Sequence, residues 1–199
     1  MDNKKMITTA RNLDTIFRLT EGFMKAFSIV FAVFFVLMKI FKEKMVMGTF
    51  SLDLDFVKLH LAGEYGAVTG LVLNHIDIIL ISGCLGCIAI RYGLKVLHGI
   101  LAPMKEGRPF DAEVPAGLRK LAWIILAGGA LIQILGIVGR ILLVNALPMD
   151  MIFSSPAIES VEYVFMFDFG FVWMFVMMIL LARIFEYGQK LQQESDETL

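Results

Sequence analysis

The chain has 199 residues, of which 58% are hydrophobic and only 19% are charged, and its mean hydropathy is +0.75. Soluble domains carry about 45–50% apolar and about 25% charged residues. The apolar excess is gathered into runs, so the composition indicates a membrane protein and argues against a soluble enzyme, a secreted disulfide scaffold or a disordered tail. The 18 Lys and Arg residues barely balance the 19 Asp and Glu residues, which argues against a nucleic-acid-binding module.

Four apolar runs predict an all-α integral membrane protein, a four-helix transmembrane bundle that forms a single domain over residues 1–199. A helix needs about 20 residues to cross the apolar core of a bilayer. Basic residues near the ends of the shorter runs, such as Lys39, can extend their charged groups to the interface and so lengthen the spans. The predicted spans are residues 22–41, 73–94, 121–144 and 164–184, followed by a tail of residues 185–199.

The distribution of Lys and Arg predicts the orientation, because these residues are enriched on the cytoplasmic side of membrane proteins. Thirteen of them lie on the side that carries both chain ends, whereas five lie on the opposite side. Both termini are therefore predicted to be cytoplasmic, and residues 147–161, which contain neither Lys nor Arg, are predicted to face outward. The first apolar run is not followed by a small-residue cleavage site, so we interpret it as an uncleaved anchor rather than a signal peptide.

Two segments outside the apolar runs have patterns of their own. Residues 12–20 place Leu13, Ile16 and Phe17 on one helical face, which fits either a short amphipathic helix at the inner interface or a helical extension of the first span. Residues 50–56 alternate apolar and polar side chains, and a second alternation begins at Val57. This period of two predicts a small extracytoplasmic β-hairpin between the first and second spans.

Polar residues inside the predicted spans form a candidate intramembrane cluster. An ionisable group at mid-depth in a bilayer costs about 3 kcal/mol unless it is paired or hydrated. Asp77, Arg140 and Asp168 are each predicted near the outer end of a span, and Gln133 shares a helical face with Arg140. Because one guanidinium can bridge two carboxylates, we predict that Arg140 joins Asp77 to Asp168 and locks the helices together. The alternative is a proton or ion site.

The residues that often carry catalysis are not arranged in a recognisable motif. Cys84 and Cys87 lie inside a predicted span among small residues, so we interpret them as packing residues rather than as a redox pair or half of a metal site. The histidines His60, His75 and His98 have no metal-ligand spacing. We therefore expect no enzymatic activity, no cofactor and no metal site.

Two cytoplasmic segments carry specific motifs. The inner loop contains Gly-Arg-Pro-Phe at residues 107–110, with Leu-Arg-Lys at residues 118–120, and the tail from Phe185 reads F-E-Y-G-Q-K-L-Q-Q-E-S-D-E-T-L. These segments resemble an uncharacterised family of small bacterial inner-membrane proteins with four spans. That family commonly has an Asn shortly after the Phe of the inner-loop motif, where this chain has Val114 and Pro115. Its members are often encoded beside a Cro/C1-type helix-turn-helix regulator, so the resemblance implies topology and a candidate partner, not a reaction.

Together these observations predict a non-enzymatic, regulatory protein of the bacterial inner membrane that binds a cytoplasmic helix-turn-helix transcription regulator and makes no direct contact with nucleic acid. A solvated helix end would explain the same tail residues. The predicted partner face joins the inner loop to the tail and comprises Gly107, Pro109, Phe110, Arg119, Gly188, Leu191, Glu194 and Asp196. The alternative function is a small transporter or immunity-type protein with a polar path between spans two, three and four, lined by Asp77, Gln133, Arg140 and Asp168.

Overall fold

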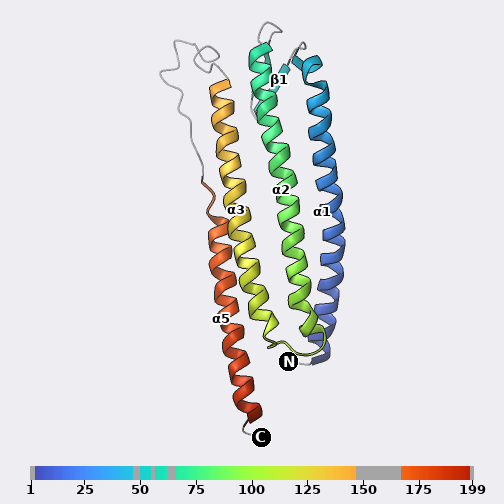
Figure 1. The fold of residues 1–199 in the computed structure, drawn as a ribbon, viewed down its shortest axis with the longest axis vertical. Helices are drawn as coiled ribbons and strands as arrows, with labels where there is room; N and C mark the ends of the chain where they lie inside the picture. Colours follow the sequence, from blue (N-terminus) through green and yellow to red (C-terminus); the bar gives the residue numbers. More distant parts are fainter. Residues whose placement is uncertain (1–2, 47–49, 55–56, 62–65, 147–166, 198–199) are drawn as a thin grey trace. The chain divides into compact units, whose positions relative to one another are not determined.

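The computed structural model describes residues 3–46, 50–54, 57–61, 66–146 and 167–197 (Figure 1). Residues 147–161, which the sequence predicts to face outward, lie outside this described part. The described elements are α1 (Asn3–Val46), β1 (Phe50–Leu54), β2 (Val57–Leu61), α2 (Gly66–Lys105), α3 (Glu113–Ala146) and α5 (Gly170–Glu197).

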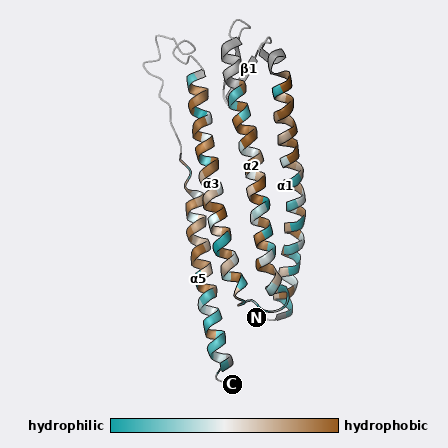
Figure 2. Cartoon of the chain, viewed as in Figure 1, coloured by the Kyte–Doolittle hydropathy of each residue, from teal (hydrophilic) through white to brown (hydrophobic). Residues whose placement is uncertain are grey.

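Within the described residues, four helices are long and apolar enough to cross a membrane, which confirms the prediction of four long apolar helices. Their candidate spans contain 38, 33, 33 and 26 residues, each more than the about 20 residues that a bilayer core requires. Hydrophobic residues follow much of each helix, and hydrophilic residues gather toward the start of α1 and the end of α5 (Figure 2). In the most apolar stretch of each helix only 6% to 22% of the residues are buried, so these helices offer a large apolar surface.

The segment before the first predicted span, from Asn3 onward, belongs to the first long helix. α1 runs without a break through 44 residues, from Asn3 to Val46. Of the two interpretations of residues 12–20, the helical extension of the first apolar run is therefore confirmed. Threonine hydroxyls along this segment donate to backbone carbonyls four residues earlier, as Thr20 does to Ile16 at 3.0 Å. These bonds satisfy short polar side chains without interrupting the helix.

The turn after α2 is fixed by its own sequence. The N–H of Gly107 donates to the carbonyl of Met104 at 3.2 Å, and the N–H of Arg108 donates to the carbonyl of Pro103 at 2.9 Å. This pair of bonds is a Schellman helix end, and it requires a left-handed residue. Gly107 has a φ of 81°, a conformation in which a Cβ would be strained. Gly107 therefore ends α2 and turns the chain toward α3.

The fourth long helix begins later than the sequence predicts. Residues 167–169 are not helical, and α5 starts at Gly170 rather than at residue 164. The Asp168 carboxylate accepts a hydrogen bond from the N–H of Gly170 at 2.7 Å, and the Phe169 carbonyl accepts one from the N–H of Val172 at 2.9 Å. An aspartate just before a helix satisfies N–H groups that have no partner within the helix. Asp168 thus caps α5 instead of lying inside a span, which corrects the prediction for this residue.

The chain divides into two compact units, each described by itself. Unit 1 comprises Met1–Ser28, Leu85–Ile132 and Asp168–Leu199, and unit 2 comprises Ile29–Cys84 and Gln133–Phe167. The core of unit 1 contains Ile100 of α2, Val114 and Leu118 of α3, and Ala182 of α5. A Cβ added at Gly117 would lie 2.5 Å from the Cγ1 atom of Ile100. The close approach of α2 and α3 in this unit therefore depends on a glycine.

Unit 2 has a separate apolar cluster, formed by Met38 of α1 with Leu73 and Leu80 of α2. The ring of Phe31 packs where a Cβ at Gly83 would come within 3.0 Å of it, so these two helices also approach closely. In this unit β1 pairs with β2 in an antiparallel arrangement, with Phe50 opposite Leu61 and Leu54 opposite Val57. The extracytoplasmic hairpin itself stays a prediction.

Candidate functional site

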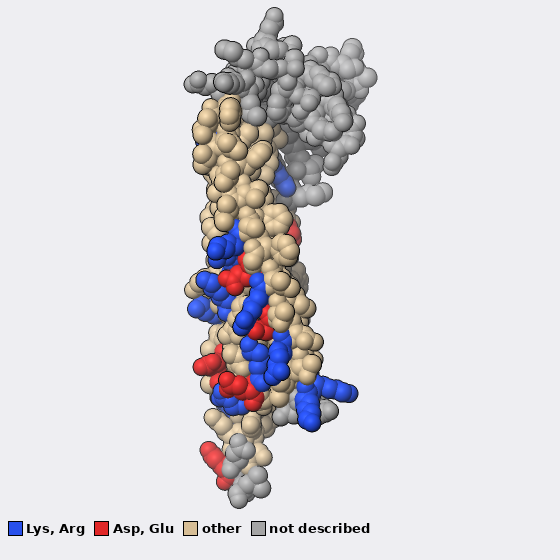
Figure 3. Space-filling model, turned by 90° about the vertical axis from the view of Figure 1, so that its right-hand side faces the viewer, with Lys and Arg blue, Asp and Glu red and all other residues tan. Residues whose placement is uncertain are grey.

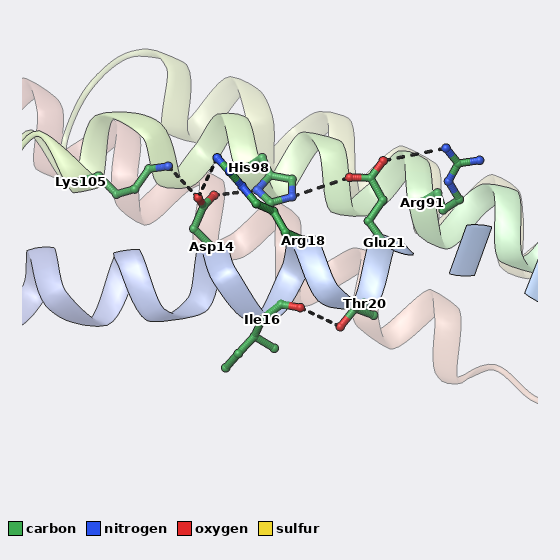
Figure 4. Close-up of polar contacts among 8 residues, drawn as sticks. All are labelled: Asp14, Ile16, Arg18, Thr20, Glu21, Arg91, His98 and Lys105. Atoms are coloured by element: carbon green, nitrogen blue, oxygen red, sulfur yellow. Dashed lines mark hydrogen bonds and ion pairs between the residues drawn. The ribbon is translucent and has the colours of Figure 1, made fainter. Parts of the chain in front are cut away.

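A nearly buried carboxylate connects α1 to α2 in unit 1. Asp14 is 7% exposed, and its Oδ1 atom lies 2.6 Å from Nδ1 of His98. Its Oδ2 atom lies 3.0 Å from Nζ of Lys105 and 3.4 Å from a guanidinium nitrogen of Arg18 (Figure 4). Because a carboxylate taken out of water must keep charged or hydrogen-bonding partners, these contacts hold Asp14 in its ionised form against α2.

The same helix pair carries a second, looser set of contacts one to two turns along. Glu21 lies 3.9 Å from a guanidinium nitrogen of Arg91 and 3.9 Å from Nε2 of His98. Phe17 meets the His98 ring edge to face, with centroids 6.3 Å apart. Figure 3 shows basic and acidic side chains next to one another on the face of the chain that it draws. The arrangement is a charge-paired seam between the two helices, which fixes their register within unit 1.

The charge-paired seam was not predicted from the sequence, although the spacing of its charged residues indicates it. Arg91, His98 and Lys105 are seven residues apart in α2, and Asp14 and Glu21 are seven apart in α1. Residues at this spacing lie on one face of a helix. Opposite charges repeated with the same period on two helices indicate pairing once the helices are known to be neighbours.

The inner loop meets the last helix in unit 1. A Cβ added at Gly188 would lie 2.6 Å from Cε1 of Phe110, so the Phe110 ring sits directly on the backbone of α5. The ring centroids of Phe110 and Phe185 are 6.0 Å apart. Arg119 of α3 forms an ion pair with Glu186 of α5. The structure thus brings the predicted loop residues Phe110 and Arg119 to the helix that carries the predicted tail residues.

A cavity of about 340 Å³ opens beside this contact. We call its lining the loop–tail surface, defined by Arg108, Phe110, Asp111, Ala112, Gln189, Gln192 and Gln193. The Arg108 guanidinium donates to the carboxylates of Glu106 and Asp111, each at 2.5 Å. The hydrogen bond to Glu106 and the negative charges of Asp111 and Glu106 raise the pKa of Arg108. The loop is therefore preordered by its own ion pairs.

The other residues of the predicted partner face have varied surroundings. Gly107 ends α2, and Pro109 is half-buried in the loop. Leu191 is 48% exposed and Glu194 is also exposed, both on the last turns of α5. Asp196 belongs to the same helix, but its side chain lies outside the described part of the chain. Leu191 and Glu194 thus lie on the same helix as Gln189, Gln192 and Gln193 of the loop–tail surface.

The predicted intramembrane cluster is divided between the two units. In unit 2, Asp77 is 8% exposed, and its carboxylate lies 2.5 Å from Nζ of Lys39, a pair that the sequence analysis did not predict. The Lys39 ammonium also lies 5.4 Å from the centroid of the Phe35 ring. Gln133 is half-buried and Arg140 is exposed in unit 2, whereas Asp168 belongs to unit 1. The joining of all four residues in one cluster stays a prediction.

The residues considered for metal or redox chemistry are spread along α2, except for His60, which lies in β2. In the part of the chain that the structure describes, no group of three His, Cys, Asp or Glu residues is placed to hold a metal ion. Cys84 is half-buried and Cys87 buried, and the two are not joined by a disulfide. In unit 2, His75 donates through Nδ1 to the carbonyl of Gly139 at 2.7 Å. That contact links α2 to α3.

The fold and the site define a protein whose four described long helices are apolar enough to cross a membrane, with a charge-paired seam and a loop–tail surface in unit 1. The chain belongs to the family described as protein of unknown function, DUF2975, which matches residues 57–199. The match covers β2, α2, α3 and α5, and therefore both partners of the loop–tail contact. No curated protein and no solved structure matches the chain.

Proposed function

We propose that this chain is a multi-pass protein of the bacterial inner membrane, with both termini in the cytoplasm and the β1–β2 pair outside. Four helices of sufficient length and hydropathy support the membrane location. The excess of Lys and Arg on the side of the chain ends supports the orientation. The resemblance of the inner loop and the tail to small bacterial membrane proteins supports the assignment to the inner membrane.

In this proposal the protein is regulatory and non-enzymatic, and it binds a cytoplasmic helix-turn-helix transcription regulator through the loop–tail surface. The observation that carries the proposal is the cavity of about 340 Å³ beside the contact of Phe110 with Gly188. Its lining combines three glutamine amides, an arginine, an aspartate and an aromatic ring. Such a mixture of an aromatic residue with arginine and hydrogen-bonding groups is typical of protein interfaces.

Preordering of the surface favours a binding role over a merely solvated helix end. Arg108 is held by two carboxylates, and Arg119 is paired with Glu186. Phe110 nevertheless remains 40% exposed and Leu191 48% exposed. Ordered loops lose less conformational entropy when a partner binds, and exposed apolar groups within them provide contact area. If the end of α5 were only solvated, the Phe110 side chain of the inner loop would not need to pack on Gly188 of α5.

The transporter alternative has one observation in its favour. Asp77 is a nearly buried carboxylate in a helix that is apolar enough to cross a membrane, and such groups often mark ion paths. Its partner Lys39 is at 2.5 Å and neutralises it, so the pair is accounted for as a helix-to-helix link. We therefore favour the regulatory role.

The experiment is a pull-down of the full-length tagged protein in detergent from cells that also express a Cro/C1-type helix-turn-helix regulator, the partner class proposed here. Two variants add the same charge to exposed positions of α5: Gln192→Lys changes the loop–tail surface, whereas Tyr187→Lys lies outside its lining. We expect the wild type and Tyr187→Lys to recover the regulator and Gln192→Lys to recover far less. No recovery by the wild type, or equal recovery by both variants, would contradict the proposal.

A further inference from the structure

A second groove lies between α2 and α3 in unit 1 and shares no lining residue with the loop–tail surface. It has a volume of about 290 Å³. Both helices contribute charged and small residues to its walls, and α2 also contributes a tyrosine and two apolar residues. The residues that matter here are Tyr92, Lys95 and Gly99 of α2 and Glu113, Gly117 and Lys120 of α3.

The two lysines mark the depth of the groove. Lys95 directly follows Leu94, the last residue of the predicted span 73–94, and Lys120 directly precedes Leu121, the first residue of the predicted span 121–144. In a helix that crosses a bilayer, the change from apolar to basic residues occurs at the headgroup region, where tyrosine is also enriched. The groove is therefore at the level of lipid phosphates when these helices are in a membrane.

The charges in the groove are available to an anion. Lys95 is exposed and forms no ion pair with any described residue. The Lys120 ammonium lies 5.4 Å from the centroid of the Tyr92 ring, a contact that leaves its N–H groups free to donate. Glu113 is the acidic residue of the lining, so two ammonium groups face one carboxylate. The balance favours a negatively charged occupant.

The shape of the groove suits a headgroup with attached acyl chains. A Cβ at Gly99 would meet no atom within 4 Å, so the mouth of the groove is open there. A Cβ at Gly117 would lie 2.5 Å from Cγ1 of Ile100, so α2 and α3 approach closely at that position. Two exposed apolar residues continue the same faces toward the middle of the helices. Ile88, 48% exposed, is one turn before Tyr92, and Leu131, 45% exposed, is three turns after Lys120.

We infer that this groove binds an anionic glycerophospholipid of the surrounding bilayer, with the phosphate between the ammonium groups of Lys95 and Lys120. The acyl chains lie along Ile88 and Leu131. Basic grooves between helices on the cytoplasmic side attract acidic lipid headgroups in this way. A zwitterionic lipid makes the same apolar contacts but lacks the net negative charge that two lysines select. The inference rests on the membrane location proposed above and is independent of the protein partner.

The test is native mass spectrometry of the purified full-length protein in detergent, with phosphatidylglycerol and phosphatidylcholine that carry the same acyl chains. The groove variant is Lys95→Gln/Lys120→Gln. The control variant, Lys25→Gln/Lys190→Gln, removes two exposed lysines elsewhere in unit 1 and has the same net charge. A third variant, Gly99→Leu, fills the mouth of the groove without changing its charges. No regulator is present, so the outcome is distinct from that of the pull-down.

We expect the wild type and the control variant to retain phosphatidylglycerol in preference to phosphatidylcholine. Each lysine near an anionic headgroup contributes about fivefold in affinity, so the groove variant, which lacks two lysines, loses about 25-fold. Gly99→Leu also loses the preference, and it decides the question if the double variant does not fold. Inorganic phosphate does not displace the lipid. Equal retention of both lipids by the wild type, equal loss in both double variants, an unaffected Gly99→Leu variant, or displacement by inorganic phosphate would each overturn the inference.

Discussion

Nδ1 of His98 lies 2.6 Å from Oδ1 of Asp14, a residue 84 positions away in the sequence. Asp14 belongs to α1, which precedes the segment matched by the family, whereas His98 lies within that segment. The Asp14 side chain is 10% exposed and the His98 side chain 21% exposed, so both are largely removed from water. This contact therefore joins α1 to the part of the chain that the family model matches, within unit 1.

Replacement of Asp14 by alanine should destabilise unit 1. The change leaves His98 and Lys105 without their shared carboxylate, and an unpaired buried polar group costs about 1–3 kcal/mol in the free energy of unfolding. Thermal unfolding in detergent measures the loss. The control is Glu106→Ala, which removes a side chain 64% exposed and paired with Arg108, and should change the free energy by less than about 1 kcal/mol. Equal effects of the two changes would show that the seam is not stabilising.

Alanine at Gly188 should disturb the contact with Phe110, because the new Cβ would lie 2.6 Å from the ring. We expect Gly188→Ala to lower stability by about 1 kcal/mol or more, since overpacking forces side chains to move. In the double variant Phe110→Ala/Gly188→Ala the ring is absent, so the second change should cost much less than it does alone. A double-mutant cycle measures this coupling, and purely additive effects would show that the two residues do not meet.

Two glycines on the facing surfaces of α2 and α3 should respond oppositely to alanine. A Cβ at Gly117 would lie 2.5 Å from Ile100, so Gly117→Ala should cost about 1–3 kcal/mol. A Cβ at Gly99 would meet nothing within 4 Å, so Gly99→Ala should stabilise α2 by up to about 1 kcal/mol through helix propensity. Thermal unfolding of both variants in the same detergent provides the comparison. Destabilisation by Gly99→Ala, or none by Gly117→Ala, would be inconsistent with this packing.

The Lys39–Asp77 pair should show energetic coupling in unit 2. Its atoms are 2.5 Å apart, but the Lys39 side chain is 48% exposed, so solvent weakens the interaction. We expect a coupling energy of about 0.5–1 kcal/mol from the single and double alanine variants. The transporter alternative requires the Asp77 carboxylate for transport itself, and not only for stability. The same Asp77→Ala variant therefore also tests that alternative. Additivity of the two changes would remove the structural role assigned to the pair.

The sequence alone was sufficient for the four long apolar helices, because hydropathy over a span does not depend on which helices are neighbours. The charge-paired seam could not be predicted from the sequence alone. The seven-residue spacing of Arg91, His98 and Lys105 indicates pairing only when α1 is known to lie beside α2. Lys39 was assigned to the interface, yet it pairs with Asp77. Asp168 was placed inside a span, where run length alone cannot distinguish a helical residue from the one that caps the helix.

The central claim is that the loop–tail surface is the site of a cytoplasmic helix-turn-helix partner. The most direct measurement is photo-crosslinking in intact cells, with a photoreactive amino acid at Gln192 in the full-length protein. Trp173, on the same helix and 72% exposed, serves as the control position in the apolar segment. The account predicts a crosslinked helix-turn-helix protein, identified by mass spectrometry, from position 192 and not from position 173. No such product from position 192, or the same product from both positions, would contradict it.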